Sequence, residues 1–107
     1  MLRIYDVALE MVADAGKVAG QVERYDSDLA RQLRRAAASV VLNIAEGFGN
    51  TGGHKRQRYQ SALGSAREVI ACIEVAWTLK YVGEHDEAVR NRLNHVTGTL
   101  VRLATRA

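Results

Sequence analysis

RQLRRAAASVVLNIAEGFG, residues 31–49, is the stretch of sequence that decides the fold of this chain. It contains no proline, it is rich in alanine and leucine, and it closes on Gly47 and Gly49, which predicts a helix followed by its stop signal. Its inner polar residues share one helical face because they follow one another at steps of four, four and three: Arg35, Ser39, Asn43 and Glu46. Apolar residues flank this polar stripe on both sides, which is not the pattern of a solvated surface helix. The stretch therefore predicts a buried or half-buried polar network that fixes how this helix meets a partner helix.

The length of 107 residues, without a linker-like region, predicts a single domain over residues 1–107 that buries about two-thirds of its unfolded surface. Proline is absent and the apolar content of 48% is ordinary for a globular domain, so an all-α chain is expected. No run approaches the roughly 18 consecutive apolar residues of a membrane span, and the first residues lack the organisation of a signal peptide. The single cysteine, Cys72, excludes an internal disulfide and fits a reducing compartment. We therefore expect a cytoplasmic protein without membrane contact.

Apolar residues at alternating steps of three and four predict three further helices around the first stretch. The four predicted helices span about residues 4–22, 27–47, 53–82 and 86–105. Asp26 or Ser27 is expected to cap the second helix, and Thr51 the third. The expected core stripe of the third helix consists of Leu63, Ala66, Ile70, Ile73 and Trp77. Because the connections are short, we predict an antiparallel up-down-up-down four-helix bundle.

A second polar stripe, Ser61, Ser65, Glu68 and Cys72, lies on the third predicted helix. Folding the second and third helices back on one another places Ser39 near Ser65 and Asn43 near Ser61. The same register places Glu46 near Arg56 or Arg58, and it predicts an Arg35–Glu68 ion pair. The predicted structural network thus comprises Arg35, Ser39, Asn43, Glu46, Ser65 and Glu68. We favour a structural role over an active site, because neither a nucleophile nor a metal-ligand set accompanies these residues.

The segments Arg34–Gly49 and Ala62–Glu68 resemble the signature of the four-helix bundle proteins named from 23S rRNA intervening sequences. The resemblance implies a bundle that assembles into a homopentameric ring, without catalytic activity or cofactor. For a related protein, the accessory variability determinant of diversity-generating retroelements, it implies a basic surface that binds nucleic acid and a partner reverse transcriptase. The segment Gly52–Arg56 departs from the family, since it is richer in glycine and more basic than the usual polar-acidic segment.

The charge is unevenly distributed along the chain. Residues 1–30 carry three basic and six acidic side chains, whereas residues 31–60 carry six basic side chains and one acidic side chain. Glycines before a helix N-terminus with cations beside it predict an anion site, which here would contact phosphate backbone in a salt-sensitive manner. The candidate nucleic-acid-binding residues are Arg31, Arg34, His54, Lys55, Arg56 and Arg58. One alternative is that the acidic first helix, of the same or a neighbouring subunit, neutralises these charges. The other is that the glycine-rich segment is a flexible hairpin with solvated charges.

A rival motif lies in the fourth predicted helix, where Arg90 and His95 resemble the arginine–histidine signature of the HEPN ribonucleases. A spacing of five splays the two side chains on a regular helix, which weakens the match. No histidine has a partner at metal-ligand spacing, so neither a metal nor a cofactor is expected. The apolar stripes exceed what one four-helix core can use, which predicts a homo-oligomer. Our interpretation is a non-enzymatic oligomeric scaffold or adaptor that binds RNA or DNA; a ribonuclease and a purely protein-interacting module are the alternatives.

Overall fold

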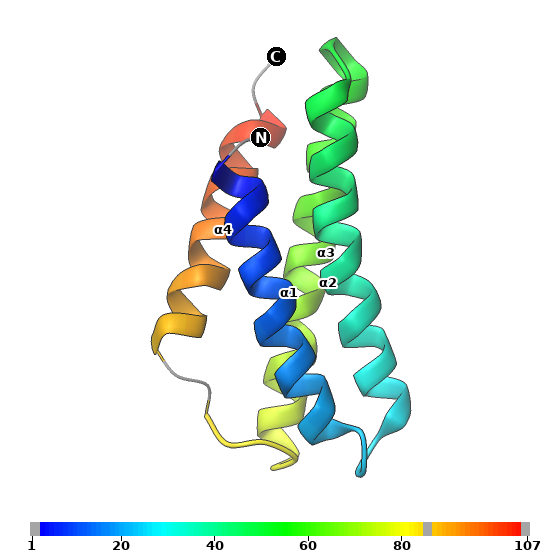
Figure 1. Ribbon diagram of the computed structural model, residues 1–107, viewed down its shortest axis with the longest axis vertical. Coiled ribbons are helices and arrows are strands. Elements are labelled where there is room, and N and C mark those ends of the chain that lie inside the picture. The colour runs from blue at the N-terminus through cyan, green and yellow to red at the C-terminus, as the bar shows by residue number, and fades with distance from the viewer. Residues whose placement is uncertain (1–2, 85–86, 106–107) are drawn as a thin grey trace.

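Four helices make up the part of the chain that the computed structural model describes, residues 3–84 and 87–105. They are α1 (Arg3–Val22), α2 (Ser27–Gly49), α3 (Gly52–Thr78) and α4 (Glu87–Thr105), and no strand occurs in these ranges. Each helix runs back along the one before it, and α2 and α3 form the long hairpin of the molecule (Figure 1). The predicted all-α fold of four helices is confirmed.

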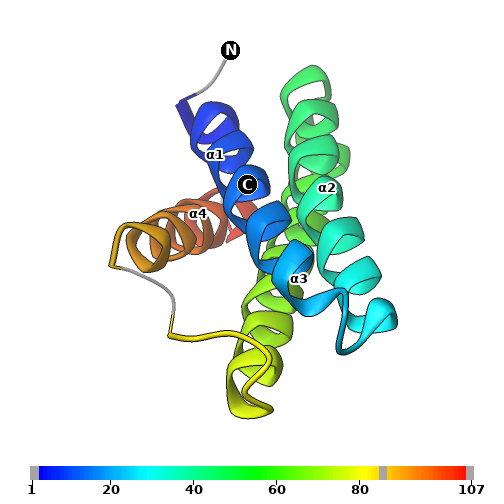
Figure 2. The ribbon, with the colours of Figure 1, turned by 60° about the horizontal axis from the view of Figure 1, so that its bottom comes forward.

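The core lies where the heptad-spaced residues of all four helices meet. Ile4, Met11 and Ala15 of α1 and Leu93 and Leu100 of α4 are buried, as their periodicity predicts. Many of the other core positions are alanines, which allow the helix backbones to approach closely. In the part of the chain that the structure describes, α1 and α3 each contact every other helix, whereas α2 and α4 do not touch (Figure 2). The outer faces of α2 and α4 therefore belong to different sides of the bundle.

The predicted caps between α1 and α3 are largely observed. The Asp26 carboxylate accepts a hydrogen bond from the Leu29 N–H at 2.9 Å, so Asp26 is the N-cap of α2. Thr51 occupies the N-cap position of α3, but its side chain makes no capping hydrogen bond. Gly52 follows with φ of +60°, a conformation that favours glycine. α3 thus begins at a turn that leaves its first N–H groups without a side-chain acceptor from Thr51.

The predicted end of the third helix is wrong, because α3 ends at Thr78 and not near residue 82. Lys80 adopts a left-handed φ of 63°, its N–H donates to the Trp77 carbonyl at 3.0 Å, and the Tyr81 N–H donates to the Ala76 carbonyl at 2.9 Å. This hydrogen-bond pair is a Schellman motif with lysine at the position where glycine is usual. Tyr81 then stacks on Tyr25 of the α1–α2 connection, with ring centroids 5.1 Å apart. The helix end therefore follows from a tertiary contact that local sequence does not show.

The structure also bears on two further predictions for this region, the burial of Trp77 and the start of the fourth helix. Trp77, which we expected in the core, is 50% exposed, because beside it lie the connection after α3 and the first turns of α4 instead of a closely packed helix. α4 begins at Glu87, and the break and cap predicted around residues 83–86 fall partly on residues 85 and 86, outside the described ranges.

Candidate nucleic-acid interface

The hairpin of α2 and α3 brings the two polar stripes together. The hydroxyl oxygens of Ser39 and Ser65 lie 2.7 Å apart, and the Asn43 amide donates to the Ser39 carbonyl at 2.9 Å. The Arg58 guanidinium contacts the Glu46 carboxylate at 2.9 Å. The register predicted from the sequence therefore holds at the Ser39–Ser65 and Glu46–Arg58 levels. Asn43 bonds within its own helix, and no hydrogen bond between Asn43 and Ser61 is found.

The predicted Arg35–Glu68 ion pair does not form, although both side chains line one small surface pocket with Ser39 and Ser65. Among the described residues, neither Arg35 nor Glu68 has an ion-pair partner, and both are exposed. The physical reason is their place at the outer edge of the helix contact, where water solvates both charges and pairing gains little. The network is therefore half-buried at its serines and open to solvent at its charged end, and the prediction of an Arg35–Glu68 ion pair is wrong.

The six candidate basic residues divide between two ends of the hairpin. Arg31 and Arg34 lie in the first turns of α2, whereas His54, Lys55, Arg56 and Arg58 lie in the first turns of α3. The α3 group is beside the C-terminal end of α2, and Arg34 is 15 residues before Gly49, so roughly 20 Å of helix separates the two groups. The structure thus does not gather the six residues into one surface.

Three of the six cations are already paired with carboxylates of the same chain. Arg34 contacts Glu23 at 2.6 Å and Arg58 contacts Glu46 at 2.9 Å. Arg31 pairs with Asp28, and this hydrogen bond, followed by the charge of the guanidinium, lowers the pKa of the Asp28 carboxyl. These three charges are therefore neutralised within the chain by Glu23, Asp28 and Glu46, none of which lies in α1, so the predicted neutralisation by the first helix is not seen at these positions.

The remaining basic residues form a group that we call the basic tip: His54, Lys55 and Arg56. His54 and Arg56 are exposed and Lys55 is half-buried, and no described carboxylate pairs with any of them. The first turn of α3 carries no acidic residue. The positive end of the helix dipole and the side-chain cations therefore act in the same direction, which is the arrangement that attracts an anion.

Arg90 and His95 do not form a joint site within the chain. The Arg90 guanidinium contacts Glu84 at 2.9 Å and lines a groove with Asn94, whereas His95 is exposed and lies outside that groove. Within the described residues, no three histidine, cysteine, aspartate or glutamate side chains cluster as metal ligands. None of the described helices has the length and apolar content to cross a membrane.

The sequence did not predict the ion pairs that join α4 to α1. Arg92 of α4 binds Asp14 of α1 through two hydrogen bonds of 2.6 and 2.8 Å, and the Asp14 side chain is only 11% exposed. Glu10, one turn before Asp14, lies 3.9 Å from the same guanidinium. The two acidic residues at a spacing of four on α1 were the available signal. Part of the acidic charge of α1 is thus neutralised by α4 and not by the basic segment.

Comparison with known proteins places the chain in a family. No curated protein matches it significantly in sequence. The crystal structure of a protein of unknown function from the S23 ribosomal protein family of Bacteroides thetaiotaomicron is similar, with a TM-score of 0.85 and 17% identity over 96% of this chain and 99% of that one. At this identity the likeness shows the shared fold. The family model of the 23S rRNA-intervening sequence proteins matches residues 1–102. The resemblance seen in Arg34–Gly49 and Ala62–Glu68 is confirmed, and the chain belongs to the family of 23S rRNA-intervening sequence proteins.

Proposed function

We propose that this protein is a non-enzymatic, oligomeric scaffold or adaptor whose basic tip binds the phosphate backbone of RNA or DNA. One observation carries the proposal: His54, Lys55 and Arg56 surround a helix N-terminus and have no carboxylate partner among the described residues. Free backbone N–H groups, the positive end of a helix dipole and unpaired cations at one point together favour the binding of phosphate oxygens.

The details of this helix start support an anion ligand. Thr51 does not use its hydroxyl to cap α3, and the left-handed Gly52 turns the backbone without a side chain in the way. A Cβ atom added at Gly52 or Gly53 would meet no atom within 4 Å, so the approach to the first turn is open. A phosphate group would then meet backbone donors and side-chain cations together. Because such contacts read no base, binding would be sensitive to salt and tolerant of sequence.

A non-enzymatic role fits the surroundings of the rival motif. Glu84 holds Arg90, and His95 lies outside the groove that Arg90 lines, so a HEPN-like reaction would need both residues rearranged or completed by a second subunit. The ribonuclease remains the enzymatic alternative, and it requires that loss of His95 abolishes RNA cleavage. A module that binds only proteins remains the other alternative.

Exposed apolar side chains support an oligomer. Large apolar residues with at least 40% of their surface exposed occur on all four helices: Leu9, Leu42, Phe48, Val75, Trp77 and Val101. Apolar surface of this kind is typical of interfaces. A ring of five copies, a cytoplasmic location and a protein partner such as a reverse transcriptase are further parts of the proposal, and the ring and the reverse transcriptase rest on the family resemblance.

The test compares the basic tip with a pair of arginines that already have carboxylate partners on the same protein. Binding of a fluorescent RNA hairpin and a DNA duplex is followed by anisotropy for the wild type, for a variant with His54, Lys55 and Arg56 changed to alanine, and for a control with Arg31 and Arg34 changed to alanine. We expect the tip variant to lose at least tenfold in affinity at low salt, and the control to lose little because its arginines already have carboxylate partners. Equal losses in both variants, or a wild type that binds neither polymer, would refute the proposal.

A further inference from the structure

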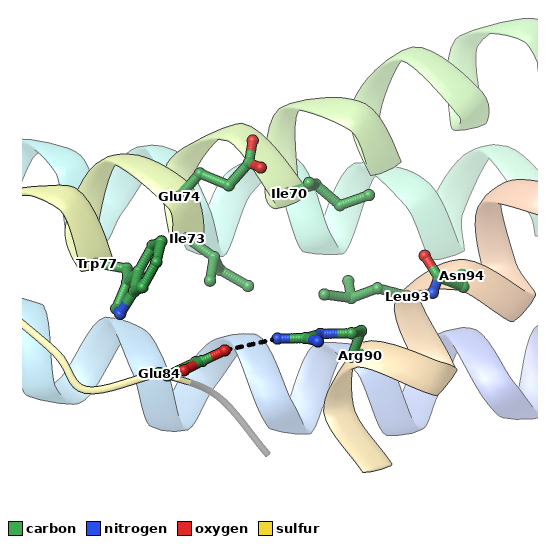
Figure 3. A pocket seen from close by; sticks show the side chains of 8 residues that line it. All are labelled: Ile70, Ile73, Glu74, Trp77, Glu84, Arg90, Leu93 and Asn94. Carbon is green, nitrogen blue, oxygen red and sulfur yellow. Dashed lines mark hydrogen bonds and ion pairs between the residues drawn. The ribbon is translucent and has the colours of Figure 1, made fainter. Parts of the chain in front are cut away.

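A groove between α3 and α4 lies beside the half-exposed Trp77. It encloses about 320 Å³ and is lined by Ile70, Ile73, Glu74, Trp77, Glu84, Arg90, Leu93 and Asn94. In Figure 3, Ile73 and Leu93 point toward one another across the floor, Trp77 closes one end, and the Glu84–Arg90 ion pair lies along one edge. Glu74 stands on the other side with no described cation as partner. The groove is thus apolar inside with a free negative charge at its rim.

The outer face of α2 carries the opposite combination. Arg31, Arg35, Ala38 and Leu42 follow one another at steps of four, three and four, and all four are exposed. Leu42 is 64% exposed, the largest value among the exposed large apolar side chains of the described residues. Arg35 has no carboxylate partner among the described residues. We call these four residues the α2 stripe.

The groove and the α2 stripe match in length as well as in charge. Ile70 and Trp77 are seven residues apart on α3, and Arg35 and Leu42 are seven residues apart on α2, which is roughly 10 Å in each case. A leucine flanked by alanine can enter an apolar groove while an arginine two turns away reaches the carboxylate at the rim. The unpaired charges, Arg35 and Glu74, have opposite signs.

We infer that the α3–α4 groove of one copy receives the α2 stripe of a second copy of this chain, with Leu42 against Trp77 and the Arg35 side chain reaching Glu74. This inference rests on the oligomer proposed above and names its interface. The two surfaces are different and lie on different sides of the bundle, so the contact is heterologous, and repeating it leads to a ring if the rotation closes.

A mixing experiment tests this pairing of surfaces. Leu42→Asp blocks the stripe and leaves the groove intact, whereas Trp77→Asp blocks the groove and leaves the stripe intact. Each variant alone is expected to be a monomer of 11.8 kDa by light scattering, and an equal mixture is expected to form dimers of about twice that mass, because one functional stripe and one functional groove remain. Ala13→Asp, at an exposed position on α1 outside both the groove and the α2 stripe, is the control and should retain the mass of the wild type.

Each outcome has a separate meaning. Variants that keep the wild-type mass, or a mixture that stays monomeric, overturn the pairing and leave the proposed oligomer standing. A wild type that is monomeric at every concentration overturns the oligomer together with this interface, while RNA binding by the basic tip is measured independently. Should Trp77→Asp fail to fold, as judged by circular dichroism, the exposed Glu74→Arg variant weakens the groove instead, and its assembly with an Arg35→Glu variant is then expected to be restored.

Discussion

Replacing Gly47 by alanine is expected to destabilise the protein, against the usual helix preference. Gly47 is buried near the C-terminal end of α2, and a Cβ atom there would lie 2.9 Å from Cε1, 3.1 Å from Cζ and 3.2 Å from Cδ1 of Tyr59. The Tyr59 ring is only 1% exposed, so it has no open space into which to move. The close contact involves the body of a buried ring and not the end of a flexible chain, which makes relief of the clash costly.

The magnitude follows from two opposing contributions. Alanine is favoured over glycine in a helix interior by about 0.8–1 kcal/mol, whereas overpacking a core typically costs about 1–3 kcal/mol. We therefore expect the free energy of unfolding of Gly47→Ala to fall by up to about 2 kcal/mol. Gly64→Ala on α3 is the matched control, because a Cβ atom there meets nothing within 4 Å, and it should gain about 0.8–1 kcal/mol.

Chemical denaturation at one fixed protein concentration measures both variants, since oligomerisation makes apparent stability depend on concentration. Tyr59→Phe provides a second test of the same contact. The Tyr59 hydroxyl is buried and has no hydrogen-bond partner among the described residues, so its removal should cost nothing. The freed space should reduce the penalty of Gly47→Ala in the double variant. A Gly47→Ala protein as stable as Gly64→Ala would refute this account of the glycine.

Three further predictions concern stability. Lys80→Gly should raise the free energy of unfolding by about 0.5–1 kcal/mol, because Lys80 holds a φ of 63° that glycine adopts without strain; an unchanged midpoint of denaturation would contradict the assigned Schellman motif. Asp14→Asn should lower the free energy of unfolding by about 1–3 kcal/mol, because it removes a largely buried carboxylate that accepts two hydrogen bonds from Arg92. The control, Glu84→Gln at the exposed Arg90 pair, should change thermal unfolding little. Equal effects of the two substitutions would argue against a special role for Asp14. Burial, and then the charge of Glu68, raises the pKa of the Cys72 thiol above its ordinary value of 9.0. The unfolded chain therefore loses the thiol proton at a lower pH than the folded chain, and the free energy of unfolding should decline as the pH rises above about 9. Cys72→Ala should show a weaker decline in pH-dependent denaturation, and an identical decline would exclude Cys72 as its source.

The parts of the structure that follow from local periodicity were predictable from the sequence. Helical spacing identified the four helices, and antiparallel register arithmetic identified the Ser39–Ser65 and Glu46–Arg58 contacts. These contacts depend only on the hairpin of α2 and α3, whose residues are close in sequence and joined by a short turn. The register does not give the burial of each pair of facing residues. For this reason it predicted an Arg35–Glu68 ion pair that does not form.

Features set by distant contacts were not predictable in this way. The end of α3 depends on Tyr81 stacking against Tyr25. Residues 79–81 contain no glycine, so the usual sequence signal for a helix C-terminus is missing there. Trp77 lies on the core stripe by spacing, yet the packing of α4 leaves half of it exposed. The basic residues of the tip were identified from composition. Only the structure shows that these three residues lack carboxylate partners among the described residues, whereas Arg31, Arg34 and Arg58 have them.

The salt dependence of RNA hairpin binding by the wild type and by the basic-tip variant tests the central claim most directly. Two charged phosphate contacts per engaged chain, from Lys55 and Arg56, predict that the logarithm of the affinity falls with the logarithm of the salt concentration with a slope of about −2. Removing His54, Lys55 and Arg56 should flatten this slope by a similar amount. A wild-type slope near zero, or one that the variant leaves unchanged, would contradict a scaffold that holds nucleic acid through the start of α3.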